Sequence, residues 1–306
     1  MAQRVISHSD DHNTAPERAI ARKTMRFFSH RLGEGSPRVG AYRDGVPVDL
    51  GPGELSDLLR TEDLAAAARR IASAPHLDES TITLLPVIAR PSKILCVGLN
   101  YVDHRAEAAI SKPAEYPDFF VRFSTTLVAC DQPIRLPSVS GALDYEGELA
   151  VVIGRGGRYI SRSDAHAHIA GYSVFNDATL RDYQFRSSQW TWGKNFDDTG
   201  AFGPVLVTPD ELPRPVEQGL KIETRLNGEM MQSASTADLI FNVATLISQI
   251  SEAVTLEPGD VLLTGTPGGV GMARQPQRYM RAGDLVEVEI EGIGTLRNRV
   301  EPEARP

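Results

Sequence analysis

The sequence is poor in cysteine and contains no long apolar run. Cys96 and Cys130 are the only cysteines among 306 residues, and both fall inside apolar segments. Two thiols are too few for a disulfide framework, so we expect reduced, packed cysteines in a cytoplasmic protein. A membrane-spanning helix needs about 20 consecutive apolar residues. Because the chain has no such run, we predict no membrane partner.

Basic residues are fewer than acidic ones. The chain has 32 Lys and Arg against 40 Asp and Glu, which gives a formal net charge of -8. A nucleic-acid partner requires a basic face for the phosphate backbone, so we predict none. Residues 1–22 are polar and lack the apolar core of a signal peptide. We expect them to form a disordered tail in which His8 and His12 are solvated and have no role.

Apolar segments and turn signals divide the chain into two parts. Residues 23–89 alternate short apolar stretches with glycine turns, which predicts a small β-rich N-terminal domain with a helix over 61–74. Residues 90–306 are expected to form a larger domain with an Asn227-Gly228 hairpin turn and a long amphipathic helix over 236–254. We predict an α+β fold of mixed, mainly antiparallel strands that curl on themselves, with helices outside.

Two glutamates stand one residue apart at the start of an apolar segment. Glu146 and Glu148 precede a run that ends at Ile153 and predicts a buried strand, in which residues i and i+2 share a face. A second strand-like segment leads into Asp177. Three carboxylates without Cys or His favour Mg²⁺, Mn²⁺ or Ca²⁺, and Mg²⁺ is the first choice. The alternative is that both glutamates line the solvent face of an edge strand.

Five motifs follow one another along about residues 90 to 300. They are Asn100-Tyr101-x-Asp103-His104-x-x-Glu107, Asp144-Tyr145-Glu146-x-Glu148, Asn176-Asp177-x-x-x-Arg181-x-x-Gln184, Gly193-Lys194-x-Phe196-Asp197 and Thr264-Gly265-Thr266-Pro267-x-Gly269-Val270-Gly271. In order and spacing they resemble the fumarylacetoacetate hydrolase family. One such motif alone would be weak evidence of a family, whereas five in the same order are strong.

The resemblance implies that residues 90–306 form the family's catalytic domain. Its strands wrap into a roll or distorted barrel, usually assembled as a homodimer. It also implies a divalent metal held by Glu146, Glu148 and Asp177. The expected partner is a small-molecule oxo acid, because the family acts on 2-oxo acids and 1,3-diketones. Family reactions include hydrolytic C–C cleavage, decarboxylation, tautomerisation and isomerisation.

Four residues are candidates for catalysis. His104 and Glu107 lie three apart in a segment of helical composition, so Glu107 can orient the imidazole and raise its basicity. Lys194 stands among aromatic and small residues and can hold an oxyanion or a substrate carboxylate. Gln184 can donate through its amide. The alternatives are a surface His beside a surface Glu, and a solvent-facing Lys.

Four further residues are expected to bind substrate. Arg181 can pair with an acidic substrate or brace the neighbouring carboxylates. Thr264 and Thr266 stand at a strand end whose amides and hydroxyls suit a carboxylate, although a plain strand-to-turn link is the alternative. Arg122 occupies a position where the family commonly has lysine. Its guanidinium cannot carry protons, but it can clamp a distal carboxylate.

The first hypothesis is hydrolysis of a C–C bond in an acylpyruvate- or fumarylacetoacetate-like acid. The reaction would pass through an enolate that a metal would stabilise. This hypothesis follows from His104 and Glu107, which could activate water. The second is a decarboxylase, isomerase or tautomerase of a 2-oxo diacid or hydroxymuconate-type intermediate, which uses the enolate without water. A non-catalytic metal-binding homologue is the third. A glycosidase fits poorly, because neighbouring carboxylates on one strand seldom straddle a sugar ring.

Overall fold

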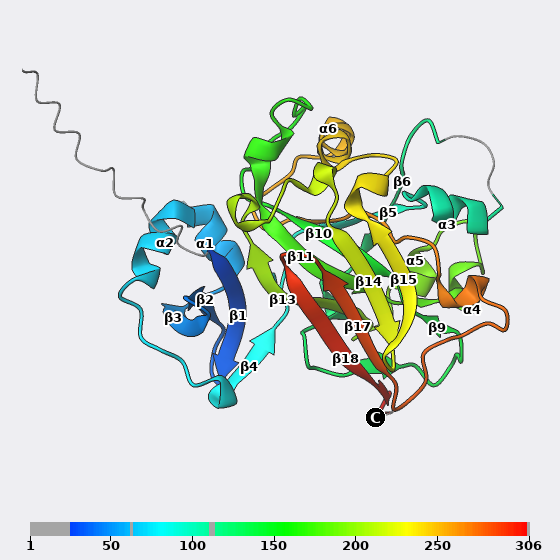
Figure 1. The fold of residues 1–306 in the computed structure, drawn as a ribbon, viewed down its shortest axis with the longest axis horizontal. Coiled ribbons are helices and arrows are strands. Elements are labelled where there is room, and N and C mark those ends of the chain that lie inside the picture. Colours follow the sequence, from blue (N-terminus) through cyan, green and yellow to red (C-terminus); the bar gives the residue numbers. More distant parts are fainter. Residues whose placement is uncertain (1–24, 62–63, 110–113, 305–306) are drawn as a thin grey trace, which may run out of the picture.

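Strands outnumber helices along the part of the chain that the structure describes (Figure 1). The structure is a computed structural model that describes residues 25–61, 64–109 and 114–304. The tail expected over residues 1–22, with His8 and His12, lies outside these ranges. Within them, no helix is both long enough and apolar enough to cross a membrane.

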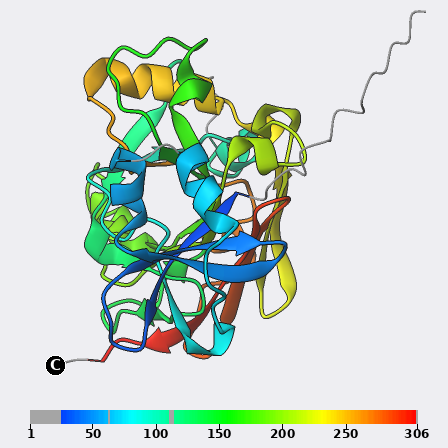
Figure 2. The same ribbon diagram turned by 90° about the vertical axis from the view of Figure 1, so that its left-hand side faces the viewer.

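Short strands and two helices form the N-terminal unit, which faces the viewer in Figure 2. Its elements are β1 (Arg26–Leu32), β2 (Arg38–Arg43), β3 (Val46–Pro52), α1 (Leu55–Thr61), α2 (Leu64–Ile71) and β4 (Ile82–Leu85). The sequence predicted one helix over 61–74. The structure has α2 within that range and a further helix, α1, before it.

Strand β1 joins this unit to the rest of the protein. Its Arg26 and Phe27 pair antiparallel with β13 (Gly200–Val207). Phe27 also belongs to a buried cluster that contains Phe175 and Phe202 from the larger part of the chain. The N-terminal unit therefore extends the main sheet, and this sheet runs across the boundary expected near residue 90.

The main sheet has 11 strands in an open order. The path is β3-β2-β1-β13-β11-β10-β16-β5-β6, with β4 on β1 and β7 on β13. Its remaining strands are β5 (Ile94–Gly98), β6 (Asp118–Arg122), β7 (Leu127–Val128), β10 (Gly147–Ile153), β11 (Ile169–Asp177) and β16 (Val261–Leu263). Along this path only β16 and β5 run parallel. Because β3 and β6 do not pair, the sheet does not close into a barrel.

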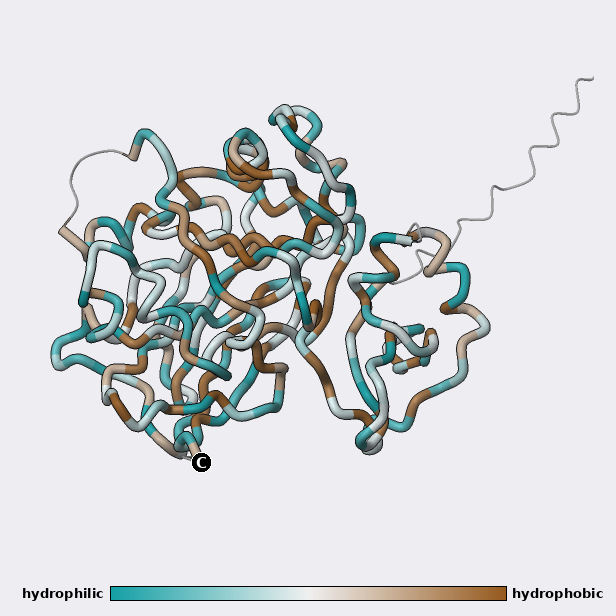
Figure 3. The backbone as a smooth tube through the Cα atoms, turned by 180° about the vertical axis from the view of Figure 1, so that it is seen from behind, coloured by the Kyte–Doolittle hydropathy of each residue, from teal (hydrophilic) through white to brown (hydrophobic). Residues whose placement is uncertain are grey.

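A five-stranded sheet packs against one face of the main sheet. Its order is β15-β14-β17-β18-β8, and a separate pair joins β12 to β9. These strands are β8 (Ile134–Leu136), β9 (Leu143–Asp144), β12 (Thr179–Leu180), β14 (Lys221–Leu226), β15 (Glu229–Ser235), β17 (Leu285–Ile290) and β18 (Gly294–Pro302). Both sheets bury apolar side chains in one cluster, and Figure 3 shows hydrophobic segments gathered in the interior. The predicted fold class is confirmed.

Local turn chemistry fixes the ends of two elements in the C-terminal half. Asn227 and Gly228 have φ angles of 52° and 81° and join β14 to β15, as the Asn-Gly pair predicted. Helix α6 (Val243–Ala253) starts later than the expected residue 236, because the Asn242 side chain caps it by accepting from Thr245 N. The start predicted for this helix was wrong.

Three short helices gather at one end of the main sheet, on the right of Figure 1. They are α3 (Val102–Glu107), α4 (Arg181–Gln184) and α5 (Thr191–Lys194). Strand β10 begins and β11 ends at this same end, since Gly147 pairs with Asn176. All five sequence motifs therefore meet around one strand junction, the fifth through Gly265 N, which donates to Glu148.

Candidate active site

Three carboxylates from two neighbouring strands converge in the interior. Glu146 immediately precedes β10, Glu148 is its second residue, and Asp177 ends β11; Asp177 N donates to Glu146 O at 2.8 Å. One oxygen of each carboxylate lies within 4.8 Å of the others. Their exposed fractions are 4 % or less. The solvent-facing alternative for the two glutamates therefore does not apply.

Strand alternation explains why these side chains share a face. Along β10, Leu149 and Val151 point into the cluster shared with the five-stranded sheet, whereas Ala150 and Val152 point the other way. Glu148 is in step with Ala150 and Val152, because successive side chains of a strand alternate between faces. The expected i and i+2 relation of the two glutamates holds in this register.

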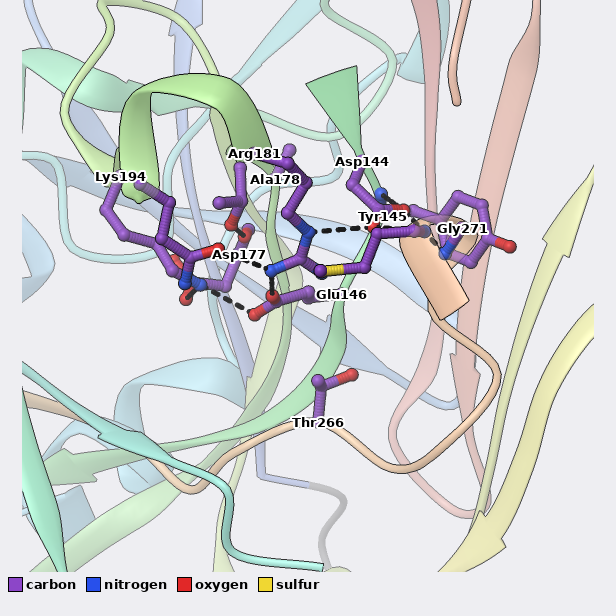
Figure 4. Close-up of polar contacts among 12 residues, drawn as sticks. Asp144, Tyr145, Glu146, Asp177, Ala178, Arg181, Lys194, Thr266 and Gly271 are labelled. Carbon is purple, nitrogen blue, oxygen red and sulfur yellow. Dashed lines mark hydrogen bonds and ion pairs between the residues drawn. The ribbon is translucent and has the colours of Figure 1, made fainter. Parts of the chain in front are cut away.

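Two buried cations hold the carboxylates in place, as Figure 4 shows. Lys194 Nζ lies 2.6 Å from Glu146 Oε2 and 2.5 Å from Asp177 Oδ2. Arg181 Nη1 lies 2.6 Å from Glu146 Oε1. Burial opposes ionisation of Glu146, but Lys194 and Arg181 outweigh it and lower the pKa of this carboxyl to about 2. Burial lowers the pKa of Lys194, but the charges of Asp177 and Glu146 outweigh it, and the net shift is upward.

Glu148 has no cationic partner among the described residues. Its Oε2 accepts from Gly265 N at 2.8 Å. Burial, and then the negative charges of Asp177 and Glu146, raise the pKa of Glu148 well above its usual value. A divalent cation would supply the missing positive charge, and three carboxylates offer it only oxygen, the ligand that hard cations prefer. The donor set therefore fits a hard divalent cation.

A cavity of about 400 Å³ opens onto Glu146 and Glu148. Most of its lining is apolar, including Phe120, Phe185, Trp190 and Met272. Its polar lining comprises His104, Glu107, Glu146, Glu148, Arg181, Gln184, Lys194 and Thr266. All four residues expected for catalysis and two of those expected to bind substrate thus surround one space.

His104 and Glu107 form a pair on helix α3. His104 Nδ1 lies 3.3 Å from Glu107 Oε2, and Gly269 N donates to Glu107 Oε1 at 2.6 Å. Burial raises the pKa of Glu107, but His104 and the Gly269 amide outweigh it, and the net shift is downward. Gly269 has a φ of 98°, and a Cβ there would lie 2.2 Å from Met231 O. Only glycine fits where this loop meets Glu107.

Arg122 and Thr264 are buried outside the cavity lining. Alternation along β6 turns Arg122 inward, and its guanidinium pairs with Asp177. The Thr264 hydroxyl donates to Leu149 O at 3.1 Å, within the sheet. Neither side chain lines the cavity, so the structure does not bring them together with the other residues expected to bind substrate. Arg122 reaches the end of β11, and Thr264 hydrogen-bonds to β10, the strand beside β16.

Asp144 supports the site, a role that its place in a sequence motif did not reveal. Its two oxygens accept from the backbone N–H groups of Tyr145, Gly271 and Met272 at 2.7 to 2.9 Å. Oδ2 also accepts from Arg181 Nε at 2.8 Å. Asp144 therefore fixes Arg181 and the Gly271 loop together, as Figure 4 shows.

We expect Asp144→Asn to destabilise the protein by roughly 3–5 kcal/mol, because it leaves one buried partner of an ion pair uncompensated. Urea unfolding followed by circular dichroism measures the change. Asp131→Asn is the matched control, since Asp131 pairs with Arg297 at 2.6 Å on the surface and such pairs contribute about 1 kcal/mol or less. Equal destabilisation by the two substitutions would contradict the role given to Asp144.

The chain matches one family model and many known proteins. Residues 93–301 match the family described as fumarylacetoacetate (FAA) hydrolase C-terminal. A Rattus norvegicus protein named oxaloacetate tautomerase Fahd2a, mitochondrial, is 44% identical over 246 residues, covering 79% of this chain and 78% of its own length. A Bacillus subtilis protein named oxaloacetate tautomerase YisK is 43% identical over 224 residues, covering 72% and 74%.

Solved structures share the architecture over almost the whole chain. The crystal structure of 2-hydroxyhepta-2,4-diene-1,7-dioate isomerase from Mycobacterium marinum superposes with a TM-score of 0.74 at 32% identity. It covers 92% of this chain and 100% of the other. The fold and the order of the motifs therefore agree with the same group of proteins.

Proposed function

This chain belongs to the fumarylacetoacetate hydrolase family of enzymes, and from that premise we propose that it is a metal-dependent tautomerase of a small 2-oxo diacid such as oxaloacetate. The sequence put C–C hydrolysis first and this group of reactions second. Relatives named as tautomerases and isomerases support the second hypothesis better than the first. The observation that carries the proposal is the cavity shared by the buried carboxylates, His104 and Lys194.

Tautomerisation moves one proton between carbon 3 and the oxygen on carbon 2. The C–H bond breaks, its electron pair becomes the C2–C3 double bond, and the oxygen gains a proton. A group that accepts the carbon-bound proton and groups that stabilise negative charge on the oxygen are therefore needed. When bound, a divalent cation would supply positive charge that stabilises this oxygen. We propose Mg²⁺, with Mn²⁺ or Ca²⁺ as substitutes.

His104 is the proposed proton carrier. The lowered pKa of Glu107 keeps this carboxylate ionised, so it acts as an acceptor and the proton of a neutral imidazole lies on Nδ1. The lone pair of Nε2 is then free to take the proton from carbon 3. Glu107 fixes this tautomer in addition to orienting the ring.

Lys194, Arg181 and Gln184 are the proposed substrate contacts. An ammonium has three N–H donors, and Lys194 directs two of them at Glu146 and Asp177, so one remains for a substrate oxygen. Arg181 Nη2 is buried without a hydrogen-bond partner within the described residues, which suits a substrate carboxylate. Gln184 accepts from Arg181 Nη1 at 2.9 Å and lines the cavity with it.

The apolar walls of the cavity favour tautomerisation over hydrolysis. Phe120, Phe185 and Trp190 make part of the cavity wall apolar, and a nucleophilic water could not be held by hydrogen bonds on that side. Proton transfer between substrate atoms needs no such water. Water is the second substrate of hydrolysis alone, whereas both reactions share the enolate.

We expect the purified protein with Mg²⁺ to accelerate loss of the ultraviolet absorbance of enol-oxaloacetate by at least about 100-fold over buffer. In heavy water, nuclear magnetic resonance should show deuterium entering carbon 3. Chelation should abolish both effects. Faster release of pyruvate from an acylpyruvate would favour hydrolysis, and faster release from oxaloacetate would favour decarboxylation; either result would contradict the proposal.

The homodimer implied by the family resemblance stays a prediction, as does the cytoplasmic location. The names of two relatives differ in what they say of location: that of the rat protein places it in mitochondria, and that of the bacterial protein gives no compartment.

A further inference from the structure

Arg122 stands at a position where the family commonly has lysine. It contacts the Asp177 oxygen that Lys194 does not bind. Its side chain has no exposed surface. Nε donates to Asp177 Oδ1, and Nη2 donates to Ala178 O. Nη1 lies 3.4 Å from the Thr199 hydroxyl. Each of its three nitrogens therefore has a partner, and two of these partners belong to the strand end that carries Asp177.

The surrounding residues are shaped for this guanidinium. The Arg122 guanidinium carbon lies 5.8 Å from the centre of the Phe175 ring. Gly200 makes room beside it, since a Cβ at that position would lie 2.7 Å from Nη1. Gly200 pairs with Asp177 across β13 and β11, and its φ is not in the left-handed region. The glycine is therefore explained by space rather than by backbone conformation.

Asp177 is held through both of its oxygens. Arg122 contacts Oδ1, while Oδ2, the oxygen bound by Lys194, is the one turned toward Glu146. With Oδ1 pinned, the carboxylate cannot rotate without breaking a buried ion pair. We propose that Arg122 is a positioning residue that orients Asp177 toward the proposed metal centre, and that Gly200 provides the space for it.

Lysine could not make the same set of contacts. Its ammonium is one compact charge on a flexible stem, whereas the guanidinium spreads donors over a fixed plane. That plane reaches the side chain of Asp177 and the carbonyl of Ala178 together. The arginine therefore fixes a backbone turn and a carboxylate at once. Groups that orient a metal ligand in this way commonly change metal affinity by about 10- to 100-fold when they are removed.

The test measures metal affinity, not turnover, because the inference rests on the proposed metal centre. Mn²⁺ is titrated into chelator-treated, full-length protein, and the dissociation constant is read by calorimetry and from the paramagnetic resonance signal of free Mn²⁺. We expect Arg122→Met to weaken binding roughly 10- to 100-fold and Arg122→Lys to be intermediate. Arg135→Met is the matched control, since Arg135 pairs with Glu301 on the surface, and it should bind like the parent.

Gly200→Ala tests the inference without removing a charge. It should weaken Mn²⁺ binding in the parent and have a smaller effect in Arg122→Met, because the added Cβ would lie 2.7 Å from the guanidinium but 3.1 Å or more from Phe175 and Thr126. A parent that does not bind Mn²⁺ would overturn the metal centre and this inference together. A parent that binds, with all three variants within twofold of it, would overturn the inference alone. Should Arg122→Met fail to fold, unchanged affinity in Arg122→Lys and Gly200→Ala would be decisive against it.

Discussion

Glu148→Gln is expected to abolish turnover and, in chelator-treated protein at neutral pH, to raise the melting temperature. The loss should be about 1,000-fold or more, because the variant removes one of three carboxylates available to a cation and places amide N–H groups there. The gain arises because Glu148 is buried without a cationic partner among the described residues. Glutamine keeps the shape and an acceptor for Gly265 N without a carboxyl that burial disfavours ionising.

The sign of the stability effect follows from the raised pKa of Glu148. A carboxyl with a raised pKa in the folded state binds its proton more tightly than in the unfolded state. It therefore costs stability above the ordinary glutamate pKa of about 4.3, and this cost disappears as the pH falls below that value. The advantage of Glu148→Gln should be largest at neutral pH and vanish near pH 4. Melting curves with and without Mg²⁺ measure it.

Glu223→Gln is the matched control for this experiment. Glu223 is also buried, but it contacts Lys221 and Arg225. Its substitution should lower the melting temperature and leave turnover unchanged. If the Glu148→Gln protein retained turnover, or if Mg²⁺ stabilised it as much as the parent, Glu148 would not be a ligand of the proposed metal centre.

His104→Ala is expected to lower turnover by roughly 100- to 10,000-fold, the usual contribution of a general base. Glu107→Gln should lower turnover less than His104→Ala does, because the amide can still contact His104 but no longer fixes one tautomer by charge. Mn²⁺ affinity should stay within a few-fold of the parent in both variants, since neither residue belongs to the carboxylate trio. Initial rates of enol loss and Mn²⁺ titration measure the two quantities.

A second histidine–glutamate pair serves as the control. His166 Nε2 lies 3.4 Å from Glu217 at an exposed site away from the cavity lining. His166→Ala should therefore leave turnover unchanged. If His104→Ala also retained full turnover while binding Mn²⁺, another group would have to carry the proton, and Lys194 would be the next candidate to test.

Local patterns predicted the parts of the site that a single strand or turn determines. The Glu146 and Glu148 spacing gave a shared face because alternation on a strand depends on neighbouring residues only. Asp177 followed from its place at the end of an apolar segment. The Asn227-Gly228 turn was also correct, since these residues tolerate the positive φ angles that the hairpin requires.

Partners distant in the chain were beyond such patterns. Arg122 and Asp177 are 55 residues apart, and nothing near Arg122 in the sequence shows that its donors face Asp177 instead of a substrate. Asp144 accepts from Gly271 N across 127 residues. Thr264 was assigned from its motif, yet its hydroxyl bonds within the sheet. In each case the packing of segments distant in the sequence decides which groups the side chain contacts.

The pairing of β1 with β13 joins the N-terminal unit to the main sheet, which also carries Asp177. Strand β13 contacts β11, the strand that ends in Asp177, on its other side. The N-terminal unit therefore cannot be replaced by a foreign segment as if it were an independent module. That segment would have to bring its own strand, correctly aligned, or leave Leu206 and Val207 of β13 without a partner on that edge.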